Sequence, residues 1–358
     1  MSMDKSFQTI VIGGGQAGLA AGYFLAQQND SFTILDENRR TGEVWRNRWD
    51  SLRLFTPSKY NGLPGMPFPK PDFYFPTKDE AADYLEAYAG RFNLPVQHGV
   101  KVELLTYNDQ GYRISTGAGS FHARNVIVAT GPYQKPYTPA FAQELDPTIL
   151  QVHSSAYRNP GQISVQNILV VGAGNSGAEI GLELARAGKR VWLAGRDVGR
   201  IPADKVGRIL GGRPYWWFIS RVLSVVTPIG RKMRSNVLYH GAPLIRASRQ
   251  EVLDAGIESI PRISGVLSGK PKVEDGRSLP AEGVIWATGF RPDFKWIDLP
   301  VFDENGYPRH QRGIVQGAPG LYFVGLPFQT ALTSALLGGV GADAAYIAGQ
   351  IANGGRSA

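Results

Sequence analysis

The chain has 358 residues, of which 43% are hydrophobic and 19% are charged, and this composition is typical of a soluble globular protein with about two domains. It contains no cysteine, which excludes a disulfide framework, a cysteine-bound metal and a thiol relay, and no metal site is expected. The net charge of +8 is concentrated between Arg196 and Arg249, where eleven Lys or Arg accompany two acids. A positively charged segment of this kind could bind nucleic acid, membrane lipid or a phosphate-rich dinucleotide.

The N-terminal residues Met1 to Ser6 are polar and lead directly into an apolar run, so no secretory signal is expected. No stretch of about 18 uncharged apolar residues occurs, which predicts no integral membrane segment. The expected location is the cytoplasm.

The first predicted unit is a strand, a glycine-rich turn, a helix and a second strand. Phe7 to Ile12 are apolar and end at Gly13-x-Gly15-x-x-Gly18, Ala17 to Ala26 form the helix, and Phe32 to Leu35 form the second strand, closed by Asp36. In this motif the first glycine permits a tight turn, the second lets a pyrophosphate approach, and the third lets helix and sheet pack closely. Asp36, 23 residues after Gly13, stands where a carboxylate would hold a ribose hydroxyl.

Residues 41–76 are rich in proline, glycine and aromatic residues and predict a long ordered loop over a ligand. A helix is expected over Asp79 to Phe92 with Thr77 as its N-cap, followed by short strands near 100–106, 111–116 and 120–122. A buried strand, Val126 to Val128, then ends in Ala129-Thr130-Gly131. Five prolines in 132–160 indicate a crossing between domains.

The same unit recurs 159 residues later. Ile168 to Val171 predict a strand, Gly172-x-Gly174-x-x-Gly177 a turn containing Asn175 and Ser176, and Ala178 to Ala187 a helix. The next strand, Arg190 to Leu193, is followed by Arg196, which suits a 2′-phosphate because a guanidinium grips phosphate through two hydrogen bonds. Asp197 is the competing residue, since it would hold a bare ribose instead.

Two such units predict two dinucleotides, and the natural chemistry is hydride transfer from a nicotinamide to a flavin. A strand near 284 ends in Ala287-Thr288-Gly289, the same Ala-Thr-Gly sequence that stands at 129–131. The last 40 residues are expected to return to the first domain, with a strand from Leu321 to Val324 and a helix from about Ser334 to Ile351. The predicted fold is α/β with two Rossmann-like domains: a three-layer FAD domain, 1–157 and 283–358, into which an NADPH domain, 158–282, is inserted.

With these motifs, nearly the whole chain resembles the class B flavin-dependent monooxygenases of the flavin-containing type, especially the short bacterial members. The resemblance rests on both glycine motifs, on GNSGAEI at 174–180, GEVWRNRWDSLRLFTP at 42–57 and HSSAYRNP at 153–160, and on WATGF at 286–290 and GLYFVG at 320–325. His153 and Tyr157 match the closing half of the family fingerprint Phe-x-Gly-x-x-x-His-x-x-x-Tyr. The opening half is absent, because Pro147 and Ile149 stand at its Phe and Gly positions.

The resemblance implies that NADPH reduces FAD, that oxygen adds as a C4a-hydroperoxide shielded by NADP⁺, and that a small thioether, amine or ketone receives an oxygen atom. Molecular oxygen and a small organic substrate are the expected partners. No nucleic acid partner is expected, and a homodimer is left open. The expected FAD contacts are Gly13, Gly15, Gln16, Ala17, Gly18, Asp36, Glu37, Trp45, Val102, Thr130, Gly131 and Gly325. The expected NADPH contacts are Gly172, Gly174, Asn175, Ser176, Gly177, Arg196, Thr288 and Gly289.

No catalytic residue is assigned, and the candidates are Phe55, His153 and Tyr157. Many family members place an Asn near the flavin where this chain has Leu54-Phe55-Thr56, so polar help must come from elsewhere or oxygenation is inefficient. His153 and Tyr157 are expected to have a structural or cofactor-facing role.

Two alternative functions remain open. One is a cysteine-free NAD(P)H:acceptor reductase of the thioredoxin-reductase type, although Leu326 follows Gly325 where that type usually has Asp. The other is a flavin-binding sensor, which would not need the intact second motif. The segment Tyr215 to Ile229 predicts either an amphipathic membrane anchor or an insert packed over the NADPH domain, and Arg221 within its apolar face favours the insert.

Overall fold

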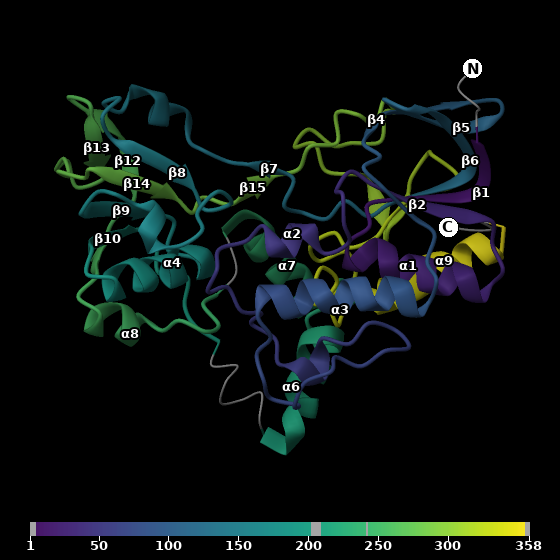
Figure 1. The fold of residues 1–358 in the computed structure, drawn as a ribbon, viewed down its shortest axis with the longest axis horizontal. Helices are drawn as coiled ribbons and strands as arrows, with labels where there is room; N and C mark the ends of the chain where they lie inside the picture. Colours follow the sequence, from purple (N-terminus) through teal and green to yellow (C-terminus); the bar gives the residue numbers. More distant parts are fainter. Residues whose placement is uncertain (1–4, 202–208, 241–242, 355–358) are drawn as a thin grey trace.

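The computed structural model describes residues 5–201, 209–240 and 243–354. Two separate sheets organise them, and Figure 1 shows each sheet in its own lobe. The first lobe contains a nine-stranded sheet in which β4 (Val102–Asn108) and β5 (Gly111–Thr116) form an antiparallel hairpin beside β6. The order of its other strands is β16 (His310–Gln311), β17 (Ile314–Val315), β18 (Leu321–Phe323), β6 (Gly119–Val128), β1 (Lys5–Ile12), β2 (Phe32–Asp36) and β3 (Val96–His98).

The first sheet is covered on both faces, which explains the continuous apolar run at the end of β1. One face packs against α1 (Gln16–Gln27), α3 (Lys78–Arg91) and α9 (Val340–Ala352) through a core that includes Val11, Ile34 and Ile127. The other face packs against the β4–β5 hairpin and the segment around Phe294. The expected three-layer arrangement is therefore present.

The second lobe contains five parallel strands in the order β11 (Glu258–Ile260), β10 (Arg190–Ala194), β9 (Asn167–Val171), β14 (Gly283–Trp286) and β8 (Leu150–His153). The helices α4 (Asn175–Arg186) and α8 (Arg249–Asp254) pack on one face. The hairpin of β12 (Ile263–Leu267) and β13 (Lys270–Val273), with the 3₁₀ turn η2 (Ala140–Glu144), covers the other. Both lobes have the expected α/β organisation.

The strand pairing moves the domain boundaries expected at 157/158 and 282/283. Those boundaries assign β8 and β14 to the first domain, whereas both strands pair within the second sheet, β14 between β9 and β8. The β8–β14 pairing joins residues more than 130 positions apart, and no local sequence pattern predicts such a contact. We therefore propose that the inserted domain extends from about Leu150 to Trp286.

The chain crosses between the lobes twice, and the two crossings pair with each other. The strands β7 (Lys135–Pro136) and β15 (Phe290–Arg291) form a short antiparallel ribbon, seen between the lobes in Figure 1. The amide N–H of Tyr137 donates to the carbonyl of Gly289 at 2.9 Å. This ribbon sets how the two Ala-Thr-Gly segments lie relative to each other.

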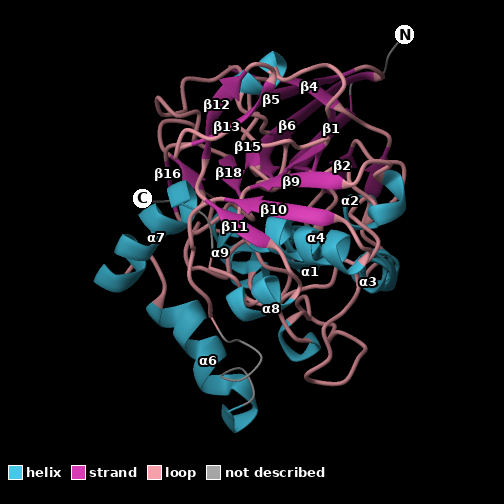
Figure 2. Ribbon diagram, turned by 90° about the vertical axis from the view of Figure 1, so that its left-hand side faces the viewer, coloured by secondary structure: helices cyan, strands magenta, loops and turns pink. Residues whose placement is uncertain are grey.

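The insert of residues 209–240 consists of η4 (Ile209–Gly212), α6 (Arg213–Trp217), the π-helical turn η5 (Phe218–Val222) and α7 (Pro228–His240). Its core contacts are with Phe328 and Leu332 of the first lobe, and Trp216 stacks on Tyr60 at 4.6 Å between ring centroids. Figure 2 shows α6 and α7 standing out on one side of the molecule. The expectation that this insert packs over the NADPH domain is wrong, because amphipathic periodicity identifies a buried face but not the surface that covers it.

Candidate functional site

Both glycine-rich turns have the same construction, and the protein itself requires the first and third glycine of each. Gly13 and Gly172 share a φ of +109°, and a Cβ on either would lie 2.6 Å or 2.3 Å from the carbonyl oxygen of Ala129 or Ala287. A Cβ on Gly18 would lie 1.9 Å from the oxygen of Gly13, and the second turn repeats this contact at 1.8 Å. Each turn is thus closed against the end of the neighbouring strand.

The middle glycines, Gly15 and Gly174, are different. Each has an ordinary φ of −78°, and a Cβ placed on it would have no atom within 4 Å. They are the N-caps of α1 and α4, and neither helix start is capped by a side chain. Free N–H groups and the positive end of a helix attract phosphate, so both turns fit a dinucleotide pyrophosphate.

Asp36 has a role that its position in the sequence did not reveal. One carboxylate oxygen accepts a hydrogen bond from the Gly14 N–H at 2.8 Å, and the other accepts bonds from the backbone and side-chain nitrogens of Asn38 at 2.8 Å each. The side chain is buried and clamps the turn, whereas Glu37 beside it is exposed. We propose that Glu37, rather than Asp36, holds the ribose hydroxyls.

Gln16 connects three segments at the start of α1. Its side-chain nitrogen donates to the carbonyl of Ala335 at 3.1 Å, and its side-chain oxygen accepts from the indole N–H of Trp45 at 3.3 Å. Ala17, next to it, lies so near Gly325 that a Cβ there would be 2.8 Å from the Ala17 Cβ. The start of α1, the tryptophan segment and the C-terminal turn therefore meet at one place.

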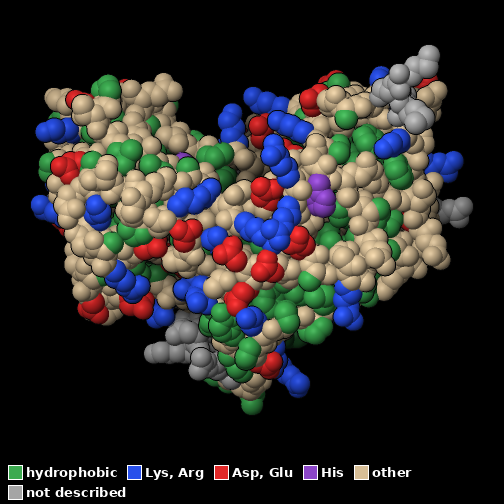
Figure 3. All heavy atoms as spheres, in the orientation of Figure 1, with side chains coloured by type: hydrophobic (Ala, Val, Ile, Leu, Met, Phe, Trp, Pro, Cys, Tyr) green, Lys and Arg blue, Asp and Glu red, His purple; other side chains and the backbone are tan. Residues whose placement is uncertain are grey.

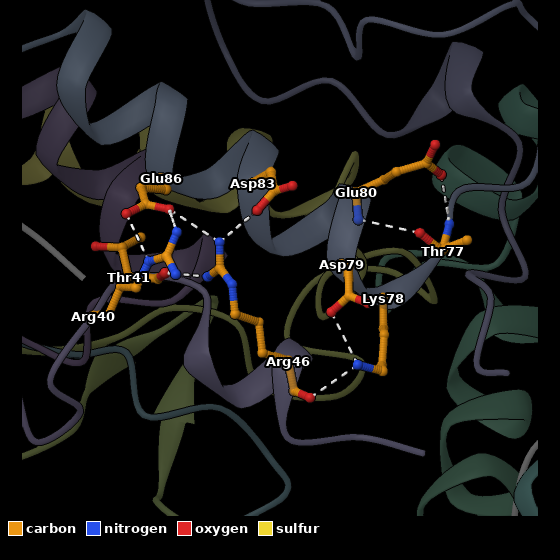
Figure 4. A network of polar contacts seen from close by, with 9 residues as sticks. All are labelled: Arg40, Thr41, Arg46, Thr77, Lys78, Asp79, Glu80, Asp83 and Glu86. Carbon is orange, nitrogen blue, oxygen red and sulfur yellow. Dashed lines mark hydrogen bonds and ion pairs between the residues drawn. The ribbon is translucent and has the colours of Figure 1, made fainter. Parts of the chain in front are cut away.

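The helix α2 (Glu43–Arg46), which carries Trp45, is held on α3 by a polar network shown in Figure 4. Arg46, whose side chain is 19% exposed, pairs with Asp83 at 2.6 Å and with Glu86 at 3.0 Å. The ammonium of Lys78 donates to the Arg46 carbonyl at 3.1 Å. α3 thus fixes the position of Trp45 over the first turn.

Three other predicted FAD residues lie at strand ends of the first lobe. Val102 begins β4 and is half-buried, while Thr130 and Gly131 follow β6. The Thr130 hydroxyl accepts a hydrogen bond from Gln134 at 2.6 Å. Their contact with FAD stays a prediction.

In the second lobe, Asn175 fastens the start of α4 to the segment after the insert. Its side chain donates to the carbonyl of Pro243 at 3.0 Å and accepts from the amide N–H of Ile245 at 2.9 Å. Because the Asn175 side chain is used in this way, Ser176, half-buried in the first turn of α4, is the neighbouring side chain that would face a ligand in the glycine turn.

Arg196 is exposed just after β10 and forms no ion pair with any residue of the described ranges. Asp197 accepts from the Gly199 N–H at 2.8 Å and pairs with Arg249 at 3.3 Å, so its carboxylate is occupied by the protein. We therefore propose Arg196, rather than Asp197, as the residue that meets the ribose and its 2′-phosphate.

A cleft of about 430 Å³ lies between the aromatic loop and the second lobe, with Arg53 and Tyr74 on one side and Arg200 and Arg246 on the other. Arg246 spans the two lobes, because its guanidinium donates to the Arg53 carbonyl at 3.2 Å and lies 3.5 Å from the carboxylate of Glu179. Burial raises the pKa of Glu179, and the charge of Arg246 opposes that rise. This cleft suits an anionic ligand with a flat apolar part.

His153 lies at the crossing between the lobes. Since the Gly289 carbonyl can only accept, the His153 Nε2–H donates to it at 3.0 Å, and Nδ1 accepts from the Ser155 N–H at 3.1 Å. Burial, with the charge of Arg48, lowers its pKa, so the ring is neutral near pH 7. Thr288 is held there too, because its hydroxyl donates to the Tyr137 carbonyl.

Tyr157 is fully buried, and its hydroxyl donates to the Glu183 carboxylate at 3.0 Å. Burial raises the pKa of this hydroxyl, and Glu183 adds to the rise. His153 and Tyr157 therefore fasten the crossing and the second lobe, and we propose no proton-transfer role for either.

The aromatic loop contains an amide that the sequence analysis missed. Asn61 is fully buried in the turn after η1 (Ser58–Tyr60), where its side-chain nitrogen donates to the Thr56 carbonyl at 2.8 Å and its oxygen accepts from the Thr56 hydroxyl. Gly338 approaches the backbone of this turn so closely that a Cβ there would be 1.6 Å from the Tyr60 carbonyl oxygen and 3.2 Å from the Asn61 backbone nitrogen. Phe55 is half-buried beside Thr56. Five residues separate Phe55 from Asn61 in the chain, and the amide reaches Thr56 only because the chain turns at η1, which no sequence pattern predicted.

No group of His, Asp and Glu in the described parts of the chain could hold a metal ion. Nor does any helix within those parts have the length and apolarity needed to cross a bilayer.

Residues 10–206, which include both glycine turns, match the family model of the pyridine nucleotide-disulphide oxidoreductases. The chain belongs to this family. A CzcO-like oxidoreductase from Geobacillus kaustophilus is 41% identical to it over 98% of this chain and all of its own. A probable indole-3-pyruvate monooxygenase from Arabidopsis thaliana, YUCCA9, is 27% identical over 96% of this chain and 88% of its own.

Among solved structures, the flavin-containing monooxygenase from Stenotrophomonas maltophilia superposes with a TM-score of 0.80, 27% identity, and coverage of 98% and 99% of the two chains. The bacillithiol disulfide reductase of Staphylococcus aureus shares the fold, with a TM-score of 0.69 and 16% identity. The resemblance to class B flavin-dependent monooxygenases is thereby confirmed. This member of the oxidoreductase family uses FAD and NADPH, as predicted.

Proposed function

We propose that this chain is an NADPH-dependent monooxygenase that oxygenates a small thioether, amine or ketone. The observation that carries the proposal is the pair of open glycine turns, one in each lobe, built to the same geometry. Bound FAD would supply the redox chemistry, taking hydride from NADPH and activating molecular oxygen. The overall reaction is balanced: NADPH, O₂, a proton and the substrate give NADP⁺, water and the oxygenated substrate.

The residues of the chain supply binding, orientation and exclusion of water. The backbone at Gly13, Gly15 and Gly18, with Glu37, would hold the FAD pyrophosphate and ribose, and Trp45 with Gln16 would cover it. Ala17, Val102, Thr130, Gly131 and Gly325 complete the proposed FAD contacts, and Asp36 acts indirectly by holding the glycine turn in place. The proposed NADPH set is Gly172, Gly174, Asn175, Ser176, Gly177, Arg196, Thr288 and Gly289.

The aromatic loop has the features needed to keep water from the reacting centre. The backbone of Tyr60 and the buried Asn61 packs against Gly338 just before α9, so the loop that carries Phe55 would form one wall of the site. A dry site lengthens the life of activated oxygen. The side-chain oxygen and one N–H of Asn61 are bonded to Thr56, so we propose that Phe55 shapes the pocket and that Asn61 holds the loop rather than the substrate.

The cleft beside the aromatic loop supports one further substrate candidate. Its arginines and Tyr74 complement an aromatic carboxylate, and several relatives are named as indole-3-pyruvate monooxygenases. Indole-3-pyruvate should therefore be assayed as a substrate together with thioethers, amines and ketones.

The deciding experiment is stopped-flow spectroscopy of the NADPH-reduced, FAD-loaded protein mixed with oxygen. A transient absorbance band between the reduced and oxidised flavin spectra is expected, prolonged by NADP⁺, together with sulfoxide from an aryl methyl thioether. Reoxidation in one step, with hydrogen peroxide as the sole product across the panel, would instead make the protein an oxidase or an NAD(P)H:acceptor flavin reductase and would refute the monooxygenase proposal. The bonded amide of Asn61 is the observation that favours this alternative.

A further inference from the structure

The insert of residues 209–240 has two faces, and the proposed function uses neither. On the inner face, Trp216, Ile219 and Leu223 follow a helical spacing and pack against Phe328 and Tyr60. The amide N–H of Leu332 donates to the Leu223 carbonyl at 2.9 Å, which ties the insert to the first lobe. The outer face therefore has a fixed orientation.

The outer face exposes large apolar side chains. Trp217 is 61% exposed and Phe218 44%, and near them in the chain Leu210, Val226 and Ile229 are 79%, 71% and 58% exposed. Half of the twelve large apolar residues described as exposed fall between 209 and 229. Figure 3 shows hydrophobic side chains at the lower tip of the molecule, where Figure 1 places α6. A concentration of this kind marks a contact surface rather than scattered exposure.

Positive charge surrounds these apolar residues. Arg213 and Arg221 lie on the same exposed stripe as Trp217 and Phe218, and Arg231 and Lys232 are exposed on α7. The sequence contains no Asp or Glu between Asp204 and Glu251. The partner of this surface must therefore be negatively charged as well as apolar.

We propose that the outer face of the insert binds the surface of an anionic lipid bilayer, with Trp217 and Phe218 entering the headgroup region and the four cations contacting lipid phosphates. Tryptophan and aliphatic side chains flanked by arginine are suited to this interface. A second copy of the chain fits less well, because a twofold contact would place the same cations opposite each other. No spanning helix is required, since the insert lies on the membrane.

The test uses the FAD-loaded protein and sedimentation with phosphatidylcholine vesicles, with and without phosphatidylglycerol. Binding is expected only with phosphatidylglycerol and should weaken with added salt. The double variant W217S/F218S should bind at least about tenfold more weakly because its apolar anchors are gone. R221Q/K232Q should bind about 25-fold more weakly, at roughly fivefold for each basic residue.

The matched control is Tyr107→Ser, which removes a 53% exposed aromatic ring from β4 in the first lobe and should leave vesicle binding unchanged. The flavin absorbance and the rate of flavin reduction by NADPH should be the same in every variant, which shows that each is folded. Failure of the native protein to sediment, or equal binding by W217S/F218S, would refute the proposal. A dimer that W217S/F218S dissociates, seen by light scattering without vesicle binding, would assign the face to a second copy.

Discussion

At the scale of single residues, the middle glycine of each turn is the most informative position. Gly15→Ala and Gly174→Ala place a methyl group in open space at an ordinary φ, so each should cost the cofactor-free protein no more than about 1 kcal/mol, the cost of a poorer helix N-cap. Because that space is where a pyrophosphate would lie, Gly15→Ala should weaken FAD retention, and Gly15→Val should abolish it.

The two variants serve as controls for each other. Gly174→Ala should keep its flavin and raise the KM for NADPH at least about tenfold, a loss of roughly 1.4 kcal/mol. Flavin absorbance after gel filtration and the NADPH dependence of flavin reduction measure the two effects separately. If Gly174→Ala loses flavin while Gly15→Ala retains it, the assignment of cofactors to lobes is reversed.

Arg196 is expected to determine the preference for NADPH over NADH. A charge-assisted contact to the 2′-phosphate contributes about 1.5–3 kcal/mol, so Arg196→Ala should raise the KM for NADPH roughly tenfold to a hundredfold and leave that for NADH nearly unchanged. Steady-state kinetics with both coenzymes measure this. Arg190→Ala removes an exposed arginine from the other end of β10 and should change neither value.

Equal use of NADH and NADPH by the native protein would contradict this assignment. Asp197 would then be the residue that meets the ribose, despite its pairing with Arg249.

At the scale of secondary-structure elements, the position of α2 on α3 depends on Arg46. Its side chain is mostly buried and meets Asp83, Glu86 and the Thr41 carbonyl, so Arg46→Ala should cost about 1–3 kcal/mol of unfolding free energy. FAD should also dissociate faster, because Trp45 is on the same helix. Denaturant titration and flavin release at fixed temperature measure the two effects.

The control is Arg40→Ala. Arg40 pairs with the same Glu86 at 2.6 Å, but its side chain is 55% exposed, and water weakens such a pair. Little change in stability or flavin release is expected. A similar loss in both variants would show that the charge of Glu86 matters, rather than the placement of α2.

The elements that could be predicted from the sequence are those with local signals. Both glycine turns, the strands before them and the helices after them follow from spacing within about 30 residues, and so does the capping box of Thr77 and Glu80 at α3. The pairing of β8 with β14, the surface under Trp216 and the return of Asn61 to Thr56 depend on contacts between distant segments or on the path of a loop. Asp36 ends β2, where the sequence analysis predicted it, but its bond from the Gly14 N–H depends on how the turn folds back on the strand, which spacing alone does not predict.

At the scale of the whole molecule, His310 should make stability depend on pH. It is half-buried on β16, its Nδ1 accepts from the Gly313 N–H at 3.1 Å, and burial together with the charge of Arg234 lowers its pKa to about 4. The unfolded chain, with a histidine pKa near 6.5, binds a proton first as the pH falls. This group therefore contributes stability above pH 6.5 that is lost between about pH 6.5 and 4.

Between pH 7 and 5 the loss should be about 1–2 kcal/mol, measured by denaturant titration with excess FAD. His310→Asn keeps an acceptor for the Gly313 N–H and should flatten this part of the pH profile. An unchanged slope in the variant would mean that other groups control the acid response.

The division of the first lobe between both ends of the sequence has a consequence for how the protein forms during synthesis. The five strands of the second sheet lie within residues 150–286, so this lobe can complete itself while the rest of the chain is still being made. The first lobe must wait for β18 and for α9, whose Ile347 joins Leu25 of α1 in one core. Until then the apolar side of α1 is uncovered. A nascent chain that pauses before α9 is synthesised therefore exposes a surface prone to aggregation, and its flavin site is incomplete because the C-terminal segment is missing.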